Sequence, residues 1–126
     1  MKDALERRPQ ACILILDELR VAIRHGATTT IVDHDEIVLA KSERNMTRIV
    51  TMDGEYRVRE PFHAALARLA SVGMTQVHRC AAVNSRRVRQ LVGRGQHRLL
   101  ILLNDGRSVV VGRNYQPRVK RQFGGS

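Results

Sequence analysis

The sequence predicts a mainly β fold built from antiparallel hairpins, with one or two short helices. Turn signals recur at short intervals, and the apolar stretches between them are only four to seven residues long, which is typical of strands. Two of these stretches, residues 28–32 and 109–111, are β-branched and suit a pleated sheet. A chain of 126 residues has room for one domain with a sizeable core.

The first part of the chain is the least defined. Residues 1–10 are polar, and residues 11–23 fit a helix nearly as well as a strand. The pair His25-Gly26 then separates residues 19–24 from residues 28–32 and indicates a hairpin. We therefore treat residues 1–18 as an N-terminal extension or linker, which can be helical.

Further hairpins are predicted along the rest of the chain. Asp53-Gly54 separates residues 47–52 from 55–59, and Asp105-Gly106 separates residues 99–103 from 107–111. An Asp-Gly pair supplies positive φ at little cost and is a strong hairpin signal. Residues 93–95, which contain two glycines, indicate another turn.

One segment has the pattern of a helix. Pro61 stands where a first helical turn tolerates proline, and Gly73 stands where a helix ends. Between them, apolar residues recur at three- and four-residue steps from Phe62 to Val72. We expect this helix to support the core rather than to bind a ligand, because its polar face carries few charges.

The charge of the chain indicates a polyanionic partner. Its formal net charge is +10, and only three of its 22 basic residues are lysine. Residues 1–60 carry ten basic and eleven acidic residues, whereas residues 61–126 carry twelve basic residues and one acidic residue, Asp105. Such a one-sided excess attracts phosphate, and the arginine fork matches phosphate oxygens and the guanine edge. The alternative explanation of the basic charge is an arginine-rich composition of the kind that is typical of a GC-rich genome.

Several function classes are disfavoured. Aromatic residues make up 3% of the chain, too few for a stacking platform for single strands, and no apolar run reaches the length of a membrane span. Cys12 and Cys80 have no metal or disulfide spacing, which fits a reducing cytoplasm. His78, Cys80 and Asn84 lie too close in one extended segment to form a nucleophilic set. We expect no enzymatic activity, no metal and no cofactor.

Two segments carry a family resemblance. They are residues 77–88, which include His78-Arg79 and Val83-Asn84, and residues 103–115, which run from Asn104-Asp105-Gly106 to Arg113. In this order, and about thirty residues apart, they resemble the LytTR-type DNA-binding domain of bacterial transcription regulators. The resemblance covers residues 19–123 and implies an elongated stack of antiparallel sheets, followed by a flexible tail at residues 124–126.

The resemblance also implies how duplex DNA would be bound, through loops that enter successive major grooves. The first loop spans residues 41–46, and we expect Arg79, Arg113, Arg44, Asn45 and Met46 to contact bases. Asn84 is expected to be structural, because an Asn at a turn can bond its own backbone. Contacts to the DNA backbone, or support for the base readers, are expected from Lys41, His78, Cys80, Arg86, Arg94, Asn114 and Lys120.

The predicted function is therefore that of a cytoplasmic, sequence-specific transcriptional regulator of the LytTR type that binds duplex DNA at direct repeats. It is either a stand-alone regulator or a fragment of a longer one, and a homodimer or a regulatory protein partner is possible, with residues 11–23 as the candidate surface. Two alternatives stay open: an anti-activator or protein-interaction module of the same fold, and a basic RNA-binding β-domain. Residues Arg118, Lys120 and Arg121 follow Pro117, and we expect a fraying end there.

Overall fold

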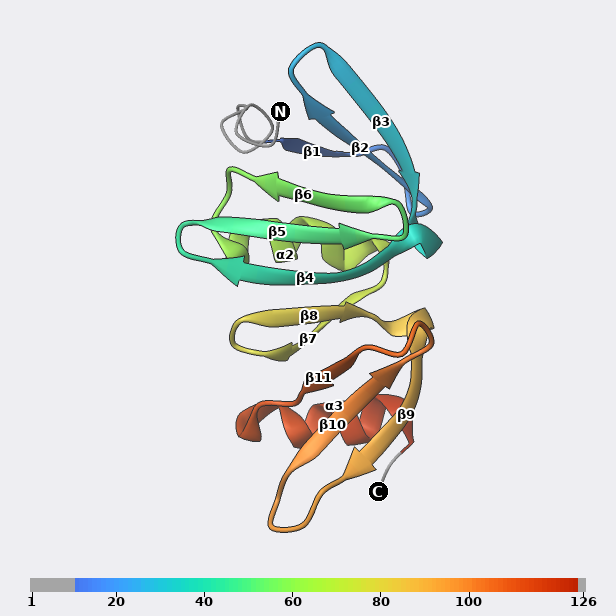
Figure 1. Cartoon of the computed structure of the whole chain (residues 1–126), viewed down its shortest axis with the longest axis vertical. Coiled ribbons are helices and arrows are strands. Elements are labelled where there is room, and N and C mark those ends of the chain that lie inside the picture. Colours follow the sequence, from blue (N-terminus) through green and yellow to red (C-terminus); the bar gives the residue numbers. More distant parts are fainter. Residues whose placement is uncertain (1–10, 125–126) are drawn as a thin grey trace.

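The computed structural model describes residues 11–124, which form three antiparallel sheets stacked along the long axis of the molecule (Figure 1). The strand orders are β1-β2-β3, β6-β5-β4-β8-β7 and β11-β10-β9. The predicted mainly β fold is confirmed, and so is the stack of antiparallel sheets.

The first sheet consists of three strands joined by short connections. Strand β2 pairs with both neighbours, and its apolar side chains Val21 and Ile23 are buried. A two-residue turn at Gly26, where φ is +61°, joins β2 to β3 as the sequence predicted. The bounds are β1 (Cys12–Ile15), β2 (Arg20–His25) and β3 (Thr28–Asp33).

The ambiguity at residues 11–23 is therefore resolved in favour of strands. Ala11 is buried, and its N–H donates to the carbonyl of Arg57 at 2.6 Å, which ties the start of β1 to the middle sheet. Strand β1 thus belongs to the folded core, ahead of the predicted start of the domain at residue 19. The predicted N-terminal extension otherwise falls on residues 1–10, outside the described part of the chain.

The middle sheet holds the other two sheets together. Its strands β4 and β8 are far apart in sequence but pair antiparallel, with Lys41 opposite Ala81. Helix α2 (Phe62–Leu69) covers one face and continues as a 3-10 turn, η2 (Ala70–Val72), to Gly73, where φ is +96°. The bounds are β4 (Ile37–Glu43), β5 (Met46–Thr51), β6 (Gly54–Val58), β7 (Met74–His78) and β8 (Ala81–Asn84).

The third sheet packs against a second short helix, α3, in agreement with the one or two short helices that the sequence predicted. Helix α3 buries Val119 completely and takes Pro117 in its first turn, so Arg118, Lys120 and Arg121 lie on an ordered helix. The expectation of a fraying end was wrong. The bounds are β9 (Val88–Gly93), β10 (Leu99–Leu103), β11 (Ser108–Val110) and α3 (Gln116–Phe123).

Two apolar cores lie between these layers. The first joins the β1-β2-β3 sheet, the middle sheet and α2 through residues such as Ile23, Ile49 and Leu69. The second joins the middle sheet to the third sheet and α3 through residues such as Val77, Ile101 and Val119. Because the middle sheet contributes to both cores, its strands fix where the turns at their ends lie. Within residues 11–124, no helix is both long and apolar enough to cross a bilayer.

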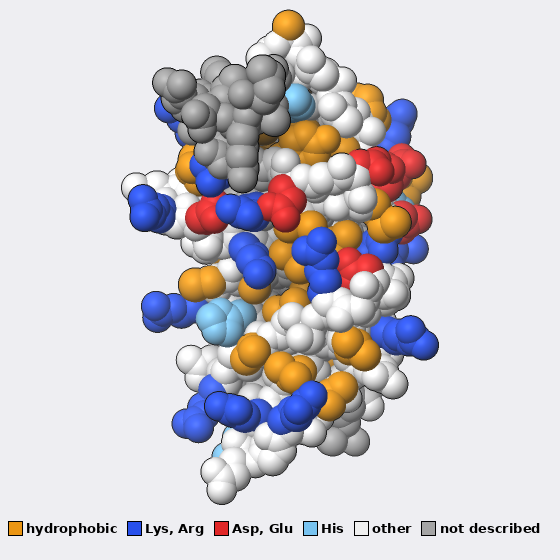
Figure 2. Space-filling view, viewed as in Figure 1, with side chains coloured by type: hydrophobic (Ala, Val, Ile, Leu, Met, Phe, Trp, Pro, Cys, Tyr) orange, Lys and Arg blue, Asp and Glu red, His pale blue; other side chains and the backbone are white. Residues whose placement is uncertain are grey.

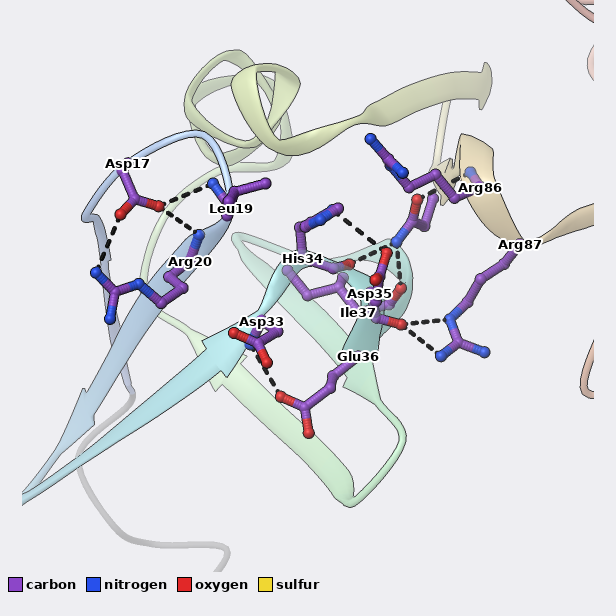
Figure 3. Close-up of polar contacts among 11 residues, drawn as sticks. Asp17, Leu19, Arg20, Asp33, His34, Asp35, Glu36, Ile37, Arg86 and Arg87 are labelled. Carbon is purple, nitrogen blue, oxygen red and sulfur yellow. Dashed lines mark hydrogen bonds and ion pairs between the residues drawn. The ribbon is translucent and has the colours of Figure 1, made fainter.

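A buried asparagine joins the layers at one end of the strands. The Nδ2 group of Asn84 donates to the carbonyls of His34 and Ile37 at 2.6 and 2.8 Å, and its Oδ1 accepts from the N–H of Arg86 at 3.0 Å. The last bond confirms the predicted turn role, and the other two tie the 3-10 turn η3 (Ser85–Arg87) to the turn η1 (His34–Glu36). Figure 3 shows these two turns facing each other, with the guanidinium of Arg87 at the carbonyl of Asp35.

Candidate nucleic-acid interface

The turn between β4 and β5 consists of two residues, Arg44 and Asn45. Glu43 pairs with Met46 directly across it, so the predicted loop of residues 41–46 is mostly strand. Arg44 has φ of +60°, nearly the value that Gly26 has at the same position of the β2–β3 turn. This conformation favours glycine, and a bulky residue that adopts it is strained. Strain of this kind at an exposed turn is a feature of functional sites.

The turn between β7 and β8 is held in place from two sides. It consists of Arg79 and Cys80, and the N–H of Cys80 donates to Nδ1 of His78 at 3.1 Å. The carbonyl of Cys80 accepts from the N–H of Ser42 at 2.9 Å, which links this turn to the end of β4. Arg79 itself is exposed, so a fixed backbone presents a free guanidinium.

The third element is the 3-10 turn η4 (Arg113–Tyr115), which follows β11. The N–H of Gly112 donates to the carbonyl of Val77 at 2.8 Å, so η4 begins beside the end of β7. A Cβ atom at residue 112 would lie 3.1 Å from Cδ2 of Tyr115 and 3.4 Å from Cδ2 of His78. Gly112 therefore serves this close approach, which brings Arg113 next to the Arg79 turn.

These three turns lie along one side of the molecule, which we call the turn edge: the β4–β5 turn, the β7–β8 turn and η4. They stand one below another at the left of Figure 1, and basic side chains line the same margin in Figure 2. Arg44, Arg79 and Arg113 are all exposed. Within residues 11–124, none of the three guanidinium groups makes a hydrogen bond or an ion pair.

The opposite ends of the strands form an acidic edge, which comprises η1, the β5–β6 turn and the β10–β11 turn. The N–H of Met52 donates to the carbonyl of Glu36 at 2.8 Å, and that of Asn104 donates to the carbonyl of Arg87 at 2.9 Å, so these turns are neighbours. Acidic side chains gather at the upper right of Figure 2. The acidic residues of this edge are Asp33, Asp35, Glu36, Asp53 and Asp105.

Several arginines away from the turn edge are paired with carboxylates. Arg48 lies between Glu43 and Glu55, at 2.5 and 2.8 Å, and these carboxylates raise the pKa of its guanidinium. Arg107 pairs with Asp105 at 3.1 Å, and Arg68 pairs with Glu60. Asp105 and Glu55 are therefore occupied, and neither neutralises Arg113.

The remaining predicted residues are spread more widely. Met46, Asn114, His78 and Cys80 accompany the three arginines on the turn edge, and Lys41 is exposed on β4 nearby. Arg94 lies at the exposed tip of the β9–β10 hairpin, and Lys120 lies half-buried on α3. Arg86 lies in η3, at the other end of β8 from Arg79, and so is separated from the turn edge.

One basic residue near these sites, Arg98, was not predicted from the sequence. It lies across the hairpin from Arg94, whose N–H donates to the Arg98 carbonyl at 2.8 Å. Hairpin symmetry about Gln96 could have indicated it. Arg118, which was expected to contact phosphate or solvent from a fraying end, lies on α3 with its guanidinium 5.5 Å from the ring centroid of Tyr115.

Comparison with known proteins gives the same family. The model of the LytTr DNA-binding domain matches residues 27–124. A solved structure, described as the LytTr DNA-binding domain of a response regulator from Bacillus cereus, matches with a TM-score of 0.72 over 84% of this chain and 97% of that chain. The two sequences are 13% identical, so this likeness shows the fold alone. No curated protein matches the chain. The chain belongs to the family of LytTr DNA-binding domains.

Proposed function

We propose that this chain is a sequence-specific regulator of transcription in the bacterial cytoplasm and that it reads duplex DNA with its turn edge. The observation that carries the proposal is the set of three exposed arginines without partners on three separate turns. These guanidinium groups are free to bind a ligand, and their donor fork suits both phosphate and the guanine edge.

In this proposal Arg79 and Arg113 contact base edges. Each is adjacent in sequence to a residue whose backbone is anchored by a hydrogen bond: Cys80 follows Arg79, and Gly112 precedes Arg113. A side chain on a fixed backbone enters a groove at a defined depth, as direct recognition of a base requires. The neighbouring β4–β5 turn contacts a second group of base pairs in the DNA site, through Arg44, Asn45 and Met46.

Contacts to the DNA backbone are assigned to residues beside the turns. Lys41 on β4, Arg94 at the β9–β10 tip and Lys120 on α3 supply positive charge beside the base readers. Such contacts position the protein and carry no sequence information themselves. We omit Arg86 from the interface because it lies at the acidic edge.

The test is selection of bound sequences from a random duplex library. We expect enriched elements arranged as direct repeats, and we expect an unlabelled duplex of the selected sequence to compete better than structured RNA. Arg113→Ala should weaken enrichment and remove the preference at the base pair that Arg113 contacts. Arg86→Ala is the matched control, because Arg86 is also exposed but lies at the opposite edge, and it should leave enrichment intact.

Three results would exclude the proposal. Better competition by RNA would favour an RNA-binding domain. No salt-dependent affinity for any duplex would favour a protein-interaction module. Equal effects of the Arg113 and Arg86 substitutions would show that the turn edge is not the binding surface.

A further inference from the structure

Strand β3 leaves one side of its backbone without a partner. His25 and Thr28 pair directly across a two-residue turn, so the N–H and C=O groups of Thr28, Thr30 and Val32 face β2. The same groups of Thr29 and Ile31 point the other way. Strand β3 is the last strand of its sheet, and no described strand pairs with that side.

Several other sheet edges in the described part of the chain are covered or charged. The free side of β1 meets the middle sheet, where Ala11 bridges Val58. The edge of β7 accepts a hydrogen bond from Gly112. Strand β9 carries Arg89 on its edge. Natural proteins protect sheet edges in these ways, by covering them or by placing charges there.

By contrast, β3 carries a charge only at its last residue, Asp33, and the rest of its edge is open. Residues 28–32 are three threonines, an isoleucine and a valine, with no charge and no proline. Ile31 is 50% exposed, and the register places Leu14, Ala22 and Ile31 side by side across the sheet. Leu14 is itself 42% exposed, whereas Ala22 between them is buried, so the exposed apolar surface of this row lies at Leu14 and, at the open edge, at Ile31.

We infer that β3 pairs with β3 of a second copy of this chain. Two copies of one strand related by a two-fold axis pair antiparallel, so the edge is complementary to itself. The pairing satisfies the outward groups of Thr29 and Ile31 and brings the two Ile31 side chains together. Two three-stranded sheets then become one continuous sheet. The apolar row of one copy continues into that of the other.

This self-association is independent of the proposed DNA contacts, because β3 and the turn edge lie on different parts of the molecule (Figure 1). Its symmetry nevertheless has a consequence for DNA. A two-fold pair fits inverted elements, whereas copies bound to direct repeats must each bind through their own turn edge with the β3 contact broken.

The test is the molar mass of the free protein as a function of concentration, measured by sedimentation equilibrium without DNA. A strand-to-strand contact is smaller than a standard interface, so we expect reversible association between about 1 µM and about 1 mM. The mass should rise from that of one chain, 14.3 kDa, toward twice that value. A mass that stays at one chain throughout would overturn the inference.

Three variants identify the contact. Thr29→Pro removes an N–H that β2 does not use, a position where an edge strand tolerates proline, and should keep the protein monomeric. Ile31→Lys should do the same by placing two positive charges together. Val110→Lys is the matched control, because Val110 is 59% exposed on an edge strand of the third sheet, and should leave association unchanged.

The circular dichroism spectrum of each variant reports whether it is folded. If Thr29→Pro prevents folding, Ile31→Lys alone decides. Folded Ile31→Lys that still dimerises would overturn the inference, and so would a Val110→Lys protein that becomes monomeric. A dimer with no DNA affinity would leave the inference standing and would contradict only the proposed function.

Discussion

Replacing Arg44 by glycine should make the protein more stable while weakening its proposed binding to DNA. Arg44 has φ of +60°, and Gly26 has φ of +61° at the same position of an equivalent two-residue turn. The two turns differ in that one uses the residue suited to this backbone and the other does not. The β2–β3 turn, with Gly26, therefore serves as an unstrained reference for the β4–β5 turn, with Arg44.

The magnitude follows from the conformation. A left-handed φ at a non-glycine residue costs roughly 1–2 kcal/mol, and part of the relief is offset because glycine loses more entropy on folding. We expect a net gain of about 1 kcal/mol for Arg44→Gly. An unfolding entropy of about 2.1 cal/mol/K per residue gives about 0.26 kcal/mol/K for 126 residues, so Tm should rise by about 4 °C.

The same substitution should lower the affinity for DNA. Arg44 has no partner within the described residues, so its loss leaves the fold intact and removes only a contact to DNA. If Arg44 reads a base, the loss weakens binding to the selected duplex by about 1–3 kcal/mol, roughly 5- to 150-fold. Thermal unfolding and a binding titration on one sample measure both effects.

Two controls separate strain from recognition. Arg44→Ala removes the guanidinium but keeps the strained φ, so it should lose affinity without gaining stability. Gly26→Ala should lower Tm by several degrees and leave DNA affinity unchanged, because that turn lies away from the turn edge. A fall in Tm for Arg44→Gly, or an unchanged affinity, would refute the reasoning.

Three further outcomes are expected. Binding to duplex DNA should weaken with a slope of roughly −4 to −6 in log K against log salt, for about four to seven phosphates, and titration at several salt concentrations checks this. Arg79→Ala or Arg113→Ala should cost about 1–3 kcal/mol on the selected duplex and little on random DNA, whereas Lys120→Ala should weaken both equally in parallel titrations. Asn84→Ala should lower the free energy of unfolding by about 2–4 kcal/mol in urea, because two buried carbonyls lose their donor.

Much of the fold was predictable because its turns have local chemistry. Gly26 and the two Asp-Gly pairs adopt turns that few other residues would favour, and Gly73 ends α2 with a left-handed φ. These signals act within a few residues and need no knowledge of the partner strand. The predicted helix starts after Pro61 and reaches η2, as its apolar spacing indicated.

The features whose bounds or placement the sequence left open depend on distant partners. Helix α3 is eight residues long and mostly polar, and it is stabilised by Val119 in the second core rather than by its own periodicity. Residues 11–15 form a strand because they pair with β2, which a local pattern does not specify. Arg86 lies at the opposite edge because β8 is only four residues long and ends before η3.

The alignment of the three turns is likewise a product of long-range pairing. The sequence indicated three basic turns, but nothing local places the β4–β5 turn beside the β7–β8 turn. That placement follows from the register of Lys41 with Ala81, forty residues further along the chain, and from the bond between Ser42 and Cys80. The sequence therefore predicted that basic residues lie at turns, but it did not predict that these turns lie along one edge.

In the proposed function, the separation of five acidic residues from the turn edge lets the chain present a basic surface to DNA. Strand β4 has seven residues, so its ends, one at each edge, lie about 20 Å apart at about 3.3 Å per step. The Debye length in physiological salt is about 8 Å. Carboxylates of the acidic edge are therefore screened from phosphates that contact the turn edge, while the free arginines there act at short range. At low salt the screening length exceeds this distance, and the acidic edge then favours the orientation in which the turn edge faces the DNA.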